Sequence, residues 1–479
     1  MTGLGLFGSL NMATRSLSTA RAGTEIAGNN LANVNTPGYA RQRVSIVTSN
    51  TVPSSLGPQG TGSMAVGISS LRDILVDSQL LGEFSIRGSL DSQQQSLQYI
   101  QSASGQQIDR QAQGATGAGS IDASGAQNGI AEDLANLFSS FQSVSNSKTT
   151  DLAERQVLML KAQNLSTQFN QVGQRLDGVR TAIGNAVTVD VTSANRLVDD
   201  IASLNAEIVK TEVGGNGRAN DLRDIRQQRL EDLSKIANFT VSETPQGASN
   251  ISIDGVPMIT GAVVNNRLEA FDAGGGQILV RAQGTATTLN LQGGSIHGRI
   301  EARDGALVKM RGEIEALASN LITEVNGIHA SGFGLTGVTG NDFFLGTGAG
   351  DIRINPALKN DPRLIQASAS AGSVGNNSVI LQLAQLGDKP ITSLLGQTFG
   401  GYYAQSIASM GQELNTLNTQ IGNQDVVQNM LERQRDSVMG VSIDEEMTDL
   451  MKFQKAFSAS AKMITTIDEM LDTIVNLKR

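Results

Sequence analysis

Apolar residues recur every seven positions at both ends of the 479-residue chain, and this spacing constrains the fold more than any other feature. Near the N-terminus two such series, three residues out of register, are Leu6, Ala13, Ala20, Ala27 and Val34, and Leu10, Leu17 and Leu31 with Thr24 in the gap. Near the C-terminus they are Leu450, Phe457, Ile464 and Leu471, and Phe453, Ile467 and Ile474 with Ser460 in the gap. Paired series of this kind form the seam of a coiled coil, so both ends are predicted to be long helices.

The two seams are complementary, because alanines of the first can pack against Phe and Ile of the second without voids. Segment 1–45 has four Arg and one Glu (+3), whereas segment 441–479 has five basic and seven acidic residues (−2). We expect an antiparallel inner domain of 1–45 plus 441–479. The seam either closes this domain within one chain or becomes ordered only when neighbouring subunits cover it.

The middle of the chain predicts a mainly α fold with a small inserted β domain. Residues 238–296 alternate in polarity around Asp254-Gly255, a dipeptide typical of hairpin turns. A mostly helical domain is expected from 46–237, 297–335 and 356–440, although 40–70 looks extended or looped because Pro and Gly interrupt it. Residues 336–355 are a Gly-rich insert with short strands.

Composition excludes several classes of protein. Lys and Arg total 36 against 45 Asp and Glu, a net charge of −9, which disfavours a protein that tracks nucleic-acid phosphates. The chain has no Cys, and no run of 18 apolar residues that would insert into a membrane. The first twenty residues do not resemble a secretory signal peptide, so an extracellular location would require another export route.

No catalytic, cofactor or metal site is predicted. His297 and His329 are the only histidines, and neither stands in a ligand or triad spacing, so each is expected at the surface or half-buried. The glycines of 3–8 match a dinucleotide motif but lack the preceding strand that such a site needs. An acidic cluster is expected in the first turns of the last helix, where the helix dipole favours anions: Asp444, Glu445, Glu446 and Asp449.

A polar segment follows the N-terminal helix, formed by Asn29, Asn30, Asn33, Asn35, Pro37, Gly38 and Tyr39. Pro and Gly stop a helix, and Asn side chains cap its free backbone groups. The segment is therefore either a plain helix stop or a joint that sets the angle between the inner helix and the next domain.

Two long motifs carry a resemblance to a known family. Residues 29–39 (NNLANVNTPGY) and 441–477 resemble the end motifs shared by the flagellar axial proteins, which are the rod, hook and hook-associated proteins. Residues 127–147, 220–243 and 325–333 are similar to the hook-associated group in particular. A hook or distal rod subunit is the alternative, since both share the end motifs.

The resemblance implies a structural subunit of the junction ring between hook and filament, needed for filament assembly and motility. It implies a ring of about eleven copies with the terminal helices innermost, next to the hook protein and a second junction protein. Export through the flagellar type III apparatus is implied, with a cytoplasmic chaperone on the C-terminal helix. The other functional class, a cell-wall hydrolase fused to axial ends, lacks a recognisable pair of carboxylates.

Overall fold

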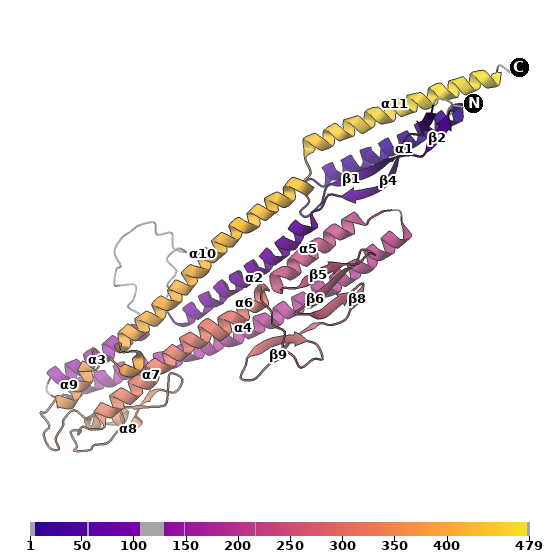
Figure 1. Ribbon diagram of the computed structural model, residues 1–479. Coiled ribbons are helices and arrows are strands. Elements are labelled where there is room, and N and C mark those ends of the chain that lie inside the picture. The colour runs from indigo at the N-terminus through magenta and orange to yellow at the C-terminus, as the bar shows by residue number, and fades with distance from the viewer. Residues whose placement is uncertain (1–4, 55–56, 106–128, 148, 216, 477–479) are drawn as a thin grey trace.

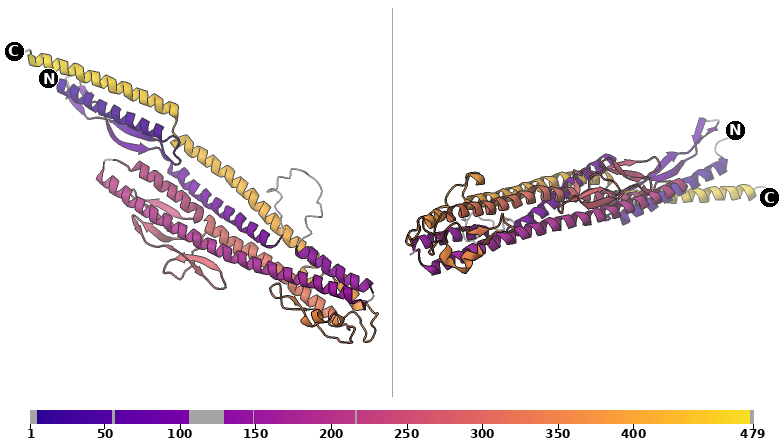
Figure 2. Two further views of the ribbon diagram at one scale, coloured as in Figure 1. Left: turned by 180° about the vertical axis from the view of Figure 1, so that it is seen from behind. Right: turned by 90° about the horizontal axis from the view of Figure 1, so that it is seen from below.

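The computed structural model describes residues 5–54, 57–105, 129–147, 149–215 and 217–476. They form a long, narrow molecule with both chain ends at one extremity and a packed helical core at the other (Figures 1 and 2). The helices are α1 (Gly5–Ala32), α2 (Ile74–Ala103), α3 (Ile130–Asn146), α4 (Leu152–Gly214), α5 (Asn220–Ile236), α6 (Gly294–Ala302), α7 (Val308–His329), α8 (Pro356–Asn360), α9 (Ser378–Gln385), α10 (Phe399–Met439) and α11 (Ile443–Asn476). None of the helices in the described ranges is both long and apolar enough to cross a membrane.

The strands are short and belong to small antiparallel sheets. They are β1 (Gln42–Thr48), β2 (Thr51–Ser54), β3 (Gly57–Gly60), β4 (Ser63–Ser70), β5 (Thr240–Glu243), β6 (Ser249–Ile253), β7 (Val256–Thr260), β8 (Val263–Val264), β9 (Leu268–Asp272), β10 (Ile278–Ala282), β11 (Phe344–Leu345) and β12 (Arg353–Ile354). The pairs are β1–β4, β2–β3, β9–β10 and β11–β12, and β5 to β8 form one sheet in chain order. The expected class, mainly α with a small β domain, is confirmed.

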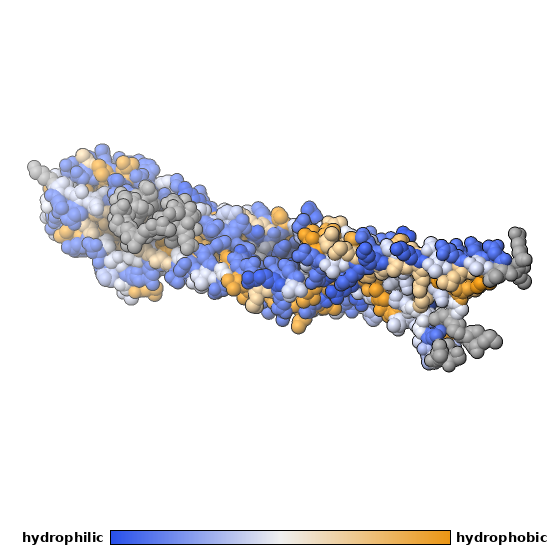
Figure 3. All heavy atoms as spheres, turned by 90° about the horizontal axis from the view of Figure 1, so that it is seen from above, coloured by the Kyte–Doolittle hydropathy of each residue, from blue (hydrophilic) through white to orange (hydrophobic). Residues whose placement is uncertain are grey.

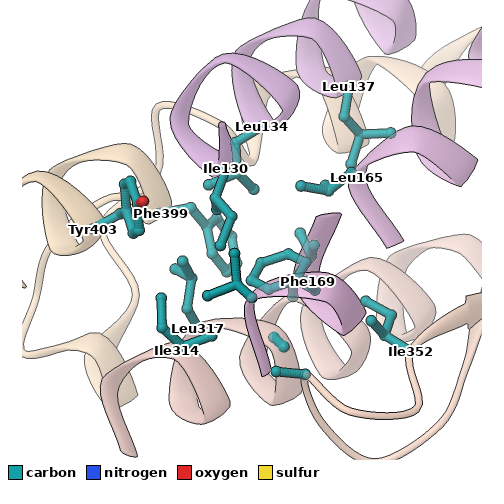
Figure 4. Close-up of a cluster of buried hydrophobic side chains, with 14 of the residues drawn as sticks. Ile130, Leu134, Leu137, Leu165, Phe169, Ile314, Leu317, Ile352, Phe399 and Tyr403 are labelled. Atoms are coloured by element: carbon teal, nitrogen blue, oxygen red, sulfur yellow. The ribbon is translucent and has the colours of Figure 1, made fainter. Parts of the chain in front are cut away.

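Long helices form the body of the molecule. The 63-residue α4 begins where Asp151 accepts a hydrogen bond from the amide of Ala153, which satisfies one of the free donors of the first turn. At the end far from the termini, α3, α4, α7 and α10 enclose the larger hydrophobic core (Figure 4). Phe169 from α4, Leu317 from α7 and Phe399 from α10 are fully buried there.

The small β domain packs on the other half of α4. Asp254 and Gly255 both have positive φ and join β6 to β7, as the hairpin dipeptide predicted. Ile251 and Met258 of this sheet are fully buried in a core that includes Val198 of α4. The domain is therefore a cover on the helical body.

Two domain boundaries differ from expectation. The described residues of 40–70 contain two strand pairs, and the β1–β4 ribbon lies along α1, so the boundary at residue 45 falls inside β1. The alternation in 63–70 was obscured because its apolar residues alternate with Ser, Ala and Gly. Residues 336–355 do not form a separate insert, since Phe343 and Phe344 are fully buried in the main core.

His329 is fully buried, which corrects the expected surface or half-buried position; His297 is half-buried and hydrogen-bonded to Ser89. His329 Nδ1 lies 2.8 Å from the carbonyl of Asn341, and Nε2 lies 3.0 Å from the amide of Gln366. Nδ1 donates and Nε2 accepts, so the ring fits this site as the neutral tautomer.

Because burial lowers the pKa of His329 from 6.5 to about 4, the unfolded chain binds more protons between these values. The contribution of His329 to the free energy of unfolding is therefore complete above pH 6.5, and it falls by roughly 3 kcal/mol as the pH drops towards 4. Denaturant unfolding across this range should show the loss, and His329→Gln should flatten it. An equal slope in the variant would assign the pH dependence to other groups.

Candidate functional site: the terminal helix pair and its joint

The two terminal helices, α1 and α11, pack antiparallel along their length (Figures 1 and 2). The predicted seam residues lie at different depths. Ala13, Ala20, Ala27 and Ile467 are buried, Leu6, Leu10, Leu17, Leu31, Val34, Leu450, Phe453, Ile464 and Leu471 are half-buried, and Phe457 and Ile474 are exposed. One chain thus covers only part of the set.

Gly23 of α1 lies directly against Phe453 of α11. A Cβ atom built at Gly23 would lie 2.5 Å from the ring of Phe453, so this aromatic residue fits only against a residue without a side chain. Heptad spacing had marked the neighbouring Thr24 as the gap. The signal that could have found Gly23 was the large aromatic residue opposite a stretch rich in Ala and Gly.

Most of α11 remains uncovered. Of its 34 residues, Glu446 and Ile467 alone are buried. Hydrophobic residues reach the surface at the end of the molecule where α1 and α11 lie (Figure 3). On α11 the exposed large ones are Ile443, Met447, Met451, Phe457, Met463, Met470, Ile474 and Val475.

The β1–β4 ribbon has its apolar residues on the outside. Met64, Val66 and Ile68 are exposed, whereas the small residues between them are half-buried. Ser63 belongs to this small set, and its carbonyl accepts a hydrogen bond from Thr19 of α1. The small set therefore faces α1, and an apolar sheet face points into solvent, which is the reverse of the usual arrangement.

Asn30 is fully buried at the joint, which is the place where α1, β1 and α11 meet. Its amide nitrogen donates to the carbonyl of Gln42 at 2.9 Å and to Oε2 of Glu446 at 3.0 Å. Its oxygen accepts from the hydroxyl of Tyr39 at 2.8 Å and from the amide of Gln42 at 3.0 Å. These four bonds use the full capacity of the amide, so Asn30 joins α1, β1 and α11 at one point.

Arg41 joins α11 to the same point. Its Nε lies 2.6 Å from Oε1 of Glu446, and both side chains are buried. Its Nη1 lies 2.5 Å from Glu445, and Nη2 lies 3.8 Å from Asp449. The acidic cluster thus lies at the start of α11, as expected, but its main partner is an arginine that sequence analysis did not single out. Burial lowers the pKa of Arg41, and the two glutamates outweigh this effect and raise it.

Tyr39 is surrounded by acids. Burial, then the charges of Asp221, Asp224 and Glu446, raise its pKa and keep its hydroxyl protonated as a donor to Asn30. Asp221 also accepts a hydrogen bond of 2.7 Å from Gln42. The two aspartates are three residues apart on one face of α5, so this helix carries the acidic wall of the joint.

Arg72 connects the joint to the body. Its Nε lies 3.0 Å from Asp224 Oδ1, Nη1 lies 2.8 Å from Asp77, and Nη2 donates to the carbonyl of Gly38 at 3.2 Å. Oδ2 of Asp224 accepts from the amide of Ala40 at 3.0 Å. Burial raises the pKa of Asp224, although Arg72 and the Ala40 amide oppose this effect.

Three backbone segments cross the joint side by side. The amide of Arg41 donates to the carbonyl of Met439 at 3.0 Å, and the amide of Leu71 donates to the carbonyl of Arg41 at 2.8 Å. The β1 entry, the β4 exit and the α10–α11 turn are therefore held together by main-chain hydrogen bonds.

The other residues of the polar segment have simpler roles. Asn33 donates to the carbonyl of Asn29 at 3.0 Å and so closes the last turn of α1. Asn35 and Pro37 are exposed, and the Pro37 carbonyl accepts from Gln228 of α5. Gly38 has φ +77°, which favours glycine. A cavity of about 950 Å³ lies between this segment and the end of α10.

We predict that Arg41→Met loosens the terminal pair, because it leaves Glu446 buried without a cation, at a cost of about 3–5 kcal/mol. Hydrogen exchange of α11 should then be faster. Replacing both members, Arg41→Met with Glu446→Leu, should cost less than the single change. Arg43→Met is the matched control, since Arg43 is exposed and forms no ion pair among the described residues. Equal exchange in Arg41→Met and Arg43→Met would contradict the role of the pair.

Comparison with known proteins agrees with this architecture. A family model for "Flagella basal body rod protein" matches residues 10–39, and one for "Flagellar basal body rod FlgEFG protein C-terminal" matches 432–477. Both terminal helices thus match the class of flagellar axial proteins. Between them, a model for "Flagellar hook-associated protein FlgK helical domain" matches 120–344.

Relatives that match almost the whole chain distinguish one group among the flagellar axial proteins. Flagellar hook-associated protein 1 of Bacillus subtilis is 26% identical over 98% of each chain, and that of Escherichia coli is 23% identical over 98% of this chain and 99% of its own. The solved flagellar hook junction protein FlgK from Burkholderia pseudomallei has the same fold, with a TM-score of 0.61 and 15% identity over 75% of this chain and all of its own. The chain belongs to the flagellar hook-associated protein 1 family, a family of structural flagellar components.

Proposed function

We propose that the protein forms the ring that joins hook to filament and that filament assembly and motility depend on it. Copies of the chain, about eleven in a closed ring, place α1 and α11 innermost. The hook protein lies on one side and the second junction protein on the other. The observation that carries this proposal is α11, a 34-residue helix that buries only Glu446 and Ile467 in one chain.

Burial in a single copy is too small to hold such a helix firmly. Each ordered residue costs roughly 1–2 kcal/mol of backbone entropy, and a fully buried large apolar residue returns roughly 1.5–3 kcal/mol. Neighbouring copies would cover the outward seam residues Phe457 and Ile474 and the apolar face of the β1–β4 ribbon. The terminal pair would thus become fully ordered in the ring.

The same exposure supports a role for an export chaperone. Before assembly, Phe457 and the exposed methionines of α11 present an apolar helix face of the kind that partner grooves bind. A cytoplasmic chaperone on α11 would keep copies apart until they leave through the flagellar type III apparatus. The role of the chain is structural throughout, with no chemical step.

Deletion of the gene tests the function. Cells without this protein should build hooks of normal length, lack filaments and release flagellin monomers into the medium, which electron microscopy and immunoblots of the medium detect. Restoring the wild-type chain should restore filaments. Missing hooks would identify a rod or hook subunit instead, and normal filaments would refute the junction role.

We further propose that the polar segment and the contacts around Asn30 act as a joint, which sets the angle between the terminal pair and the body. The carbonyl of Gly38 accepts a hydrogen bond from Arg72, just before α2, and that of Pro37 accepts one from Gln228 of α5. These contacts support a defined angle, because each joins the segment to a different part of the body.

The joint is tested by Pro37→Ala combined with Gly38→Ala. The second change forces a Cβ onto a positive φ and to 2.5 Å from the Gln228 side chain. Swimming and filament number should fall while circular dichroism of the purified chain stays normal. Gly28→Ala is the control, since a Cβ there meets no atom within 4 Å. Normal filament assembly in the double variant would count against the joint.

A further inference from the structure

Arg155, near the start of α4, is a buried charge at the end of the molecule far from the terminal pair. It is 0% exposed and ranks among the largest fully buried side chains. Its side chain forms no ion pair with a carboxylate in the described part of the chain. A buried cation without a counter-charge is costly, because the protein interior solvates it poorly.

Backbone carbonyls compensate this charge only in part. Nε donates to the carbonyl of Thr149 at 2.9 Å, and Nη1 donates to those of Pro362 at 3.1 Å and Ile365 at 2.7 Å. The remaining nitrogen, Nη2, has no hydrogen-bond partner among the described residues. Burial lowers the pKa of Arg155 to about 10, so the guanidinium stays charged at neutral pH.

A cavity of about 220 Å³ lies against this arginine. One water needs only about 10–15 Å³ on this measure, so the space has room for an occupant larger than one water. Two loops border it, 333–337 on one side and 367–374 on the other, and the second carries the hydroxyls of Ser370 and Ser373. Among the described residues, no acidic side chain lines the cavity. The cavity therefore offers a ligand one cationic side chain, hydroxyl groups and the backbone of glycine-rich loops.

We propose that this cavity binds a small oxyanion of the phosphate or sulfate type, with Arg155 as its counter-charge. Two donors on Nη2 and the serine hydroxyls match the several acceptor oxygens of such an ion, and charge-assisted hydrogen bonds of arginine are strong. A bound oxyanion would tie the two loops to α4 and so stabilise the distal core. This site is independent of the junction function, which rests on the terminal pair.

Thermal unfolding of the full chain with inorganic phosphate tests the site, with sodium chloride at equal ionic strength as reference. Phosphate should raise the midpoint saturably, on the order of 2 °C at a hundredfold excess over its dissociation constant. Arg155→Met should abolish this rise. Arg363→Met is the matched control, because Arg363 lies in the turn whose carbonyls bind Arg155 but is exposed and paired with Asp361. An equal rise in both variants, as expected from general salt effects, would overturn the proposal.

A second variant keeps the test decisive if Arg155→Met does not fold. Ser373→Glu places a carboxylate on the loop that borders the cavity, where it can replace the oxyanion. This variant should unfold at a higher temperature than the wild type without phosphate and should no longer respond to phosphate. Isothermal titration of the wild type with phosphate should show one saturable site. A wild type that takes up no phosphate, or a Ser373→Glu chain that responds normally, would refute the site.

Discussion

The buried contact of Arg41 and Asn30 with Glu446 is the interaction on which the arrangement of the two halves depends. It joins residues about 400 positions apart in the chain. Glu446 lies in the first turn of α11, Asn30 lies in the last turn of α1, and Arg41 follows α1. A buried ion pair contributes little net stability on its own, but breaking it leaves a charge that nothing solvates. Such a contact therefore selects one position of α11 relative to β1. The heptad seam cannot make that selection alone, since a slide of seven residues would preserve its pattern.

Periodicity predicted the long elements because their apolar spacing repeats many times. The terminal helices were found from this repeat, and the hairpin at Asp254 and Gly255 from the alternation around its turn dipeptide. The β1–β4 ribbon was not, because its outward Met64, Val66 and Ile68 alternate with residues that carry almost no hydrophobic signal. A strand that buries its small residues and exposes its large apolar ones lacks the usual pattern of a buried apolar face, so its sequence was interpreted as a loop.

The candidate site was predicted in outline and not in its contacts. The Asn-rich segment and the acidic cluster were recognised, yet Arg41, Arg72 and Asp224, which connect them, lie in three separate stretches with no common motif. Buried polar contacts of this kind depend on tertiary geometry, and spacing along one helix does not encode them. The sequence left both the helix stop and the joint open. The four hydrogen bonds of Asn30 support the proposed joint, because they connect the end of α1 to β1 and to α11.

The three backbone segments that cross the joint have a mechanical consequence. A pull or twist applied to the terminal pair reaches the body through two covalent connections, from β4 to α2 and from α10 to α11, and the β1 entry bridges them. The hydrogen bonds from Arg41 to Met439 and from Leu71 to Arg41 tie them laterally, so they resist shear together. A rotating shaft built from such subunits would carry torque through two covalent connections braced by the β1 entry, whereas a single linker would allow free rotation.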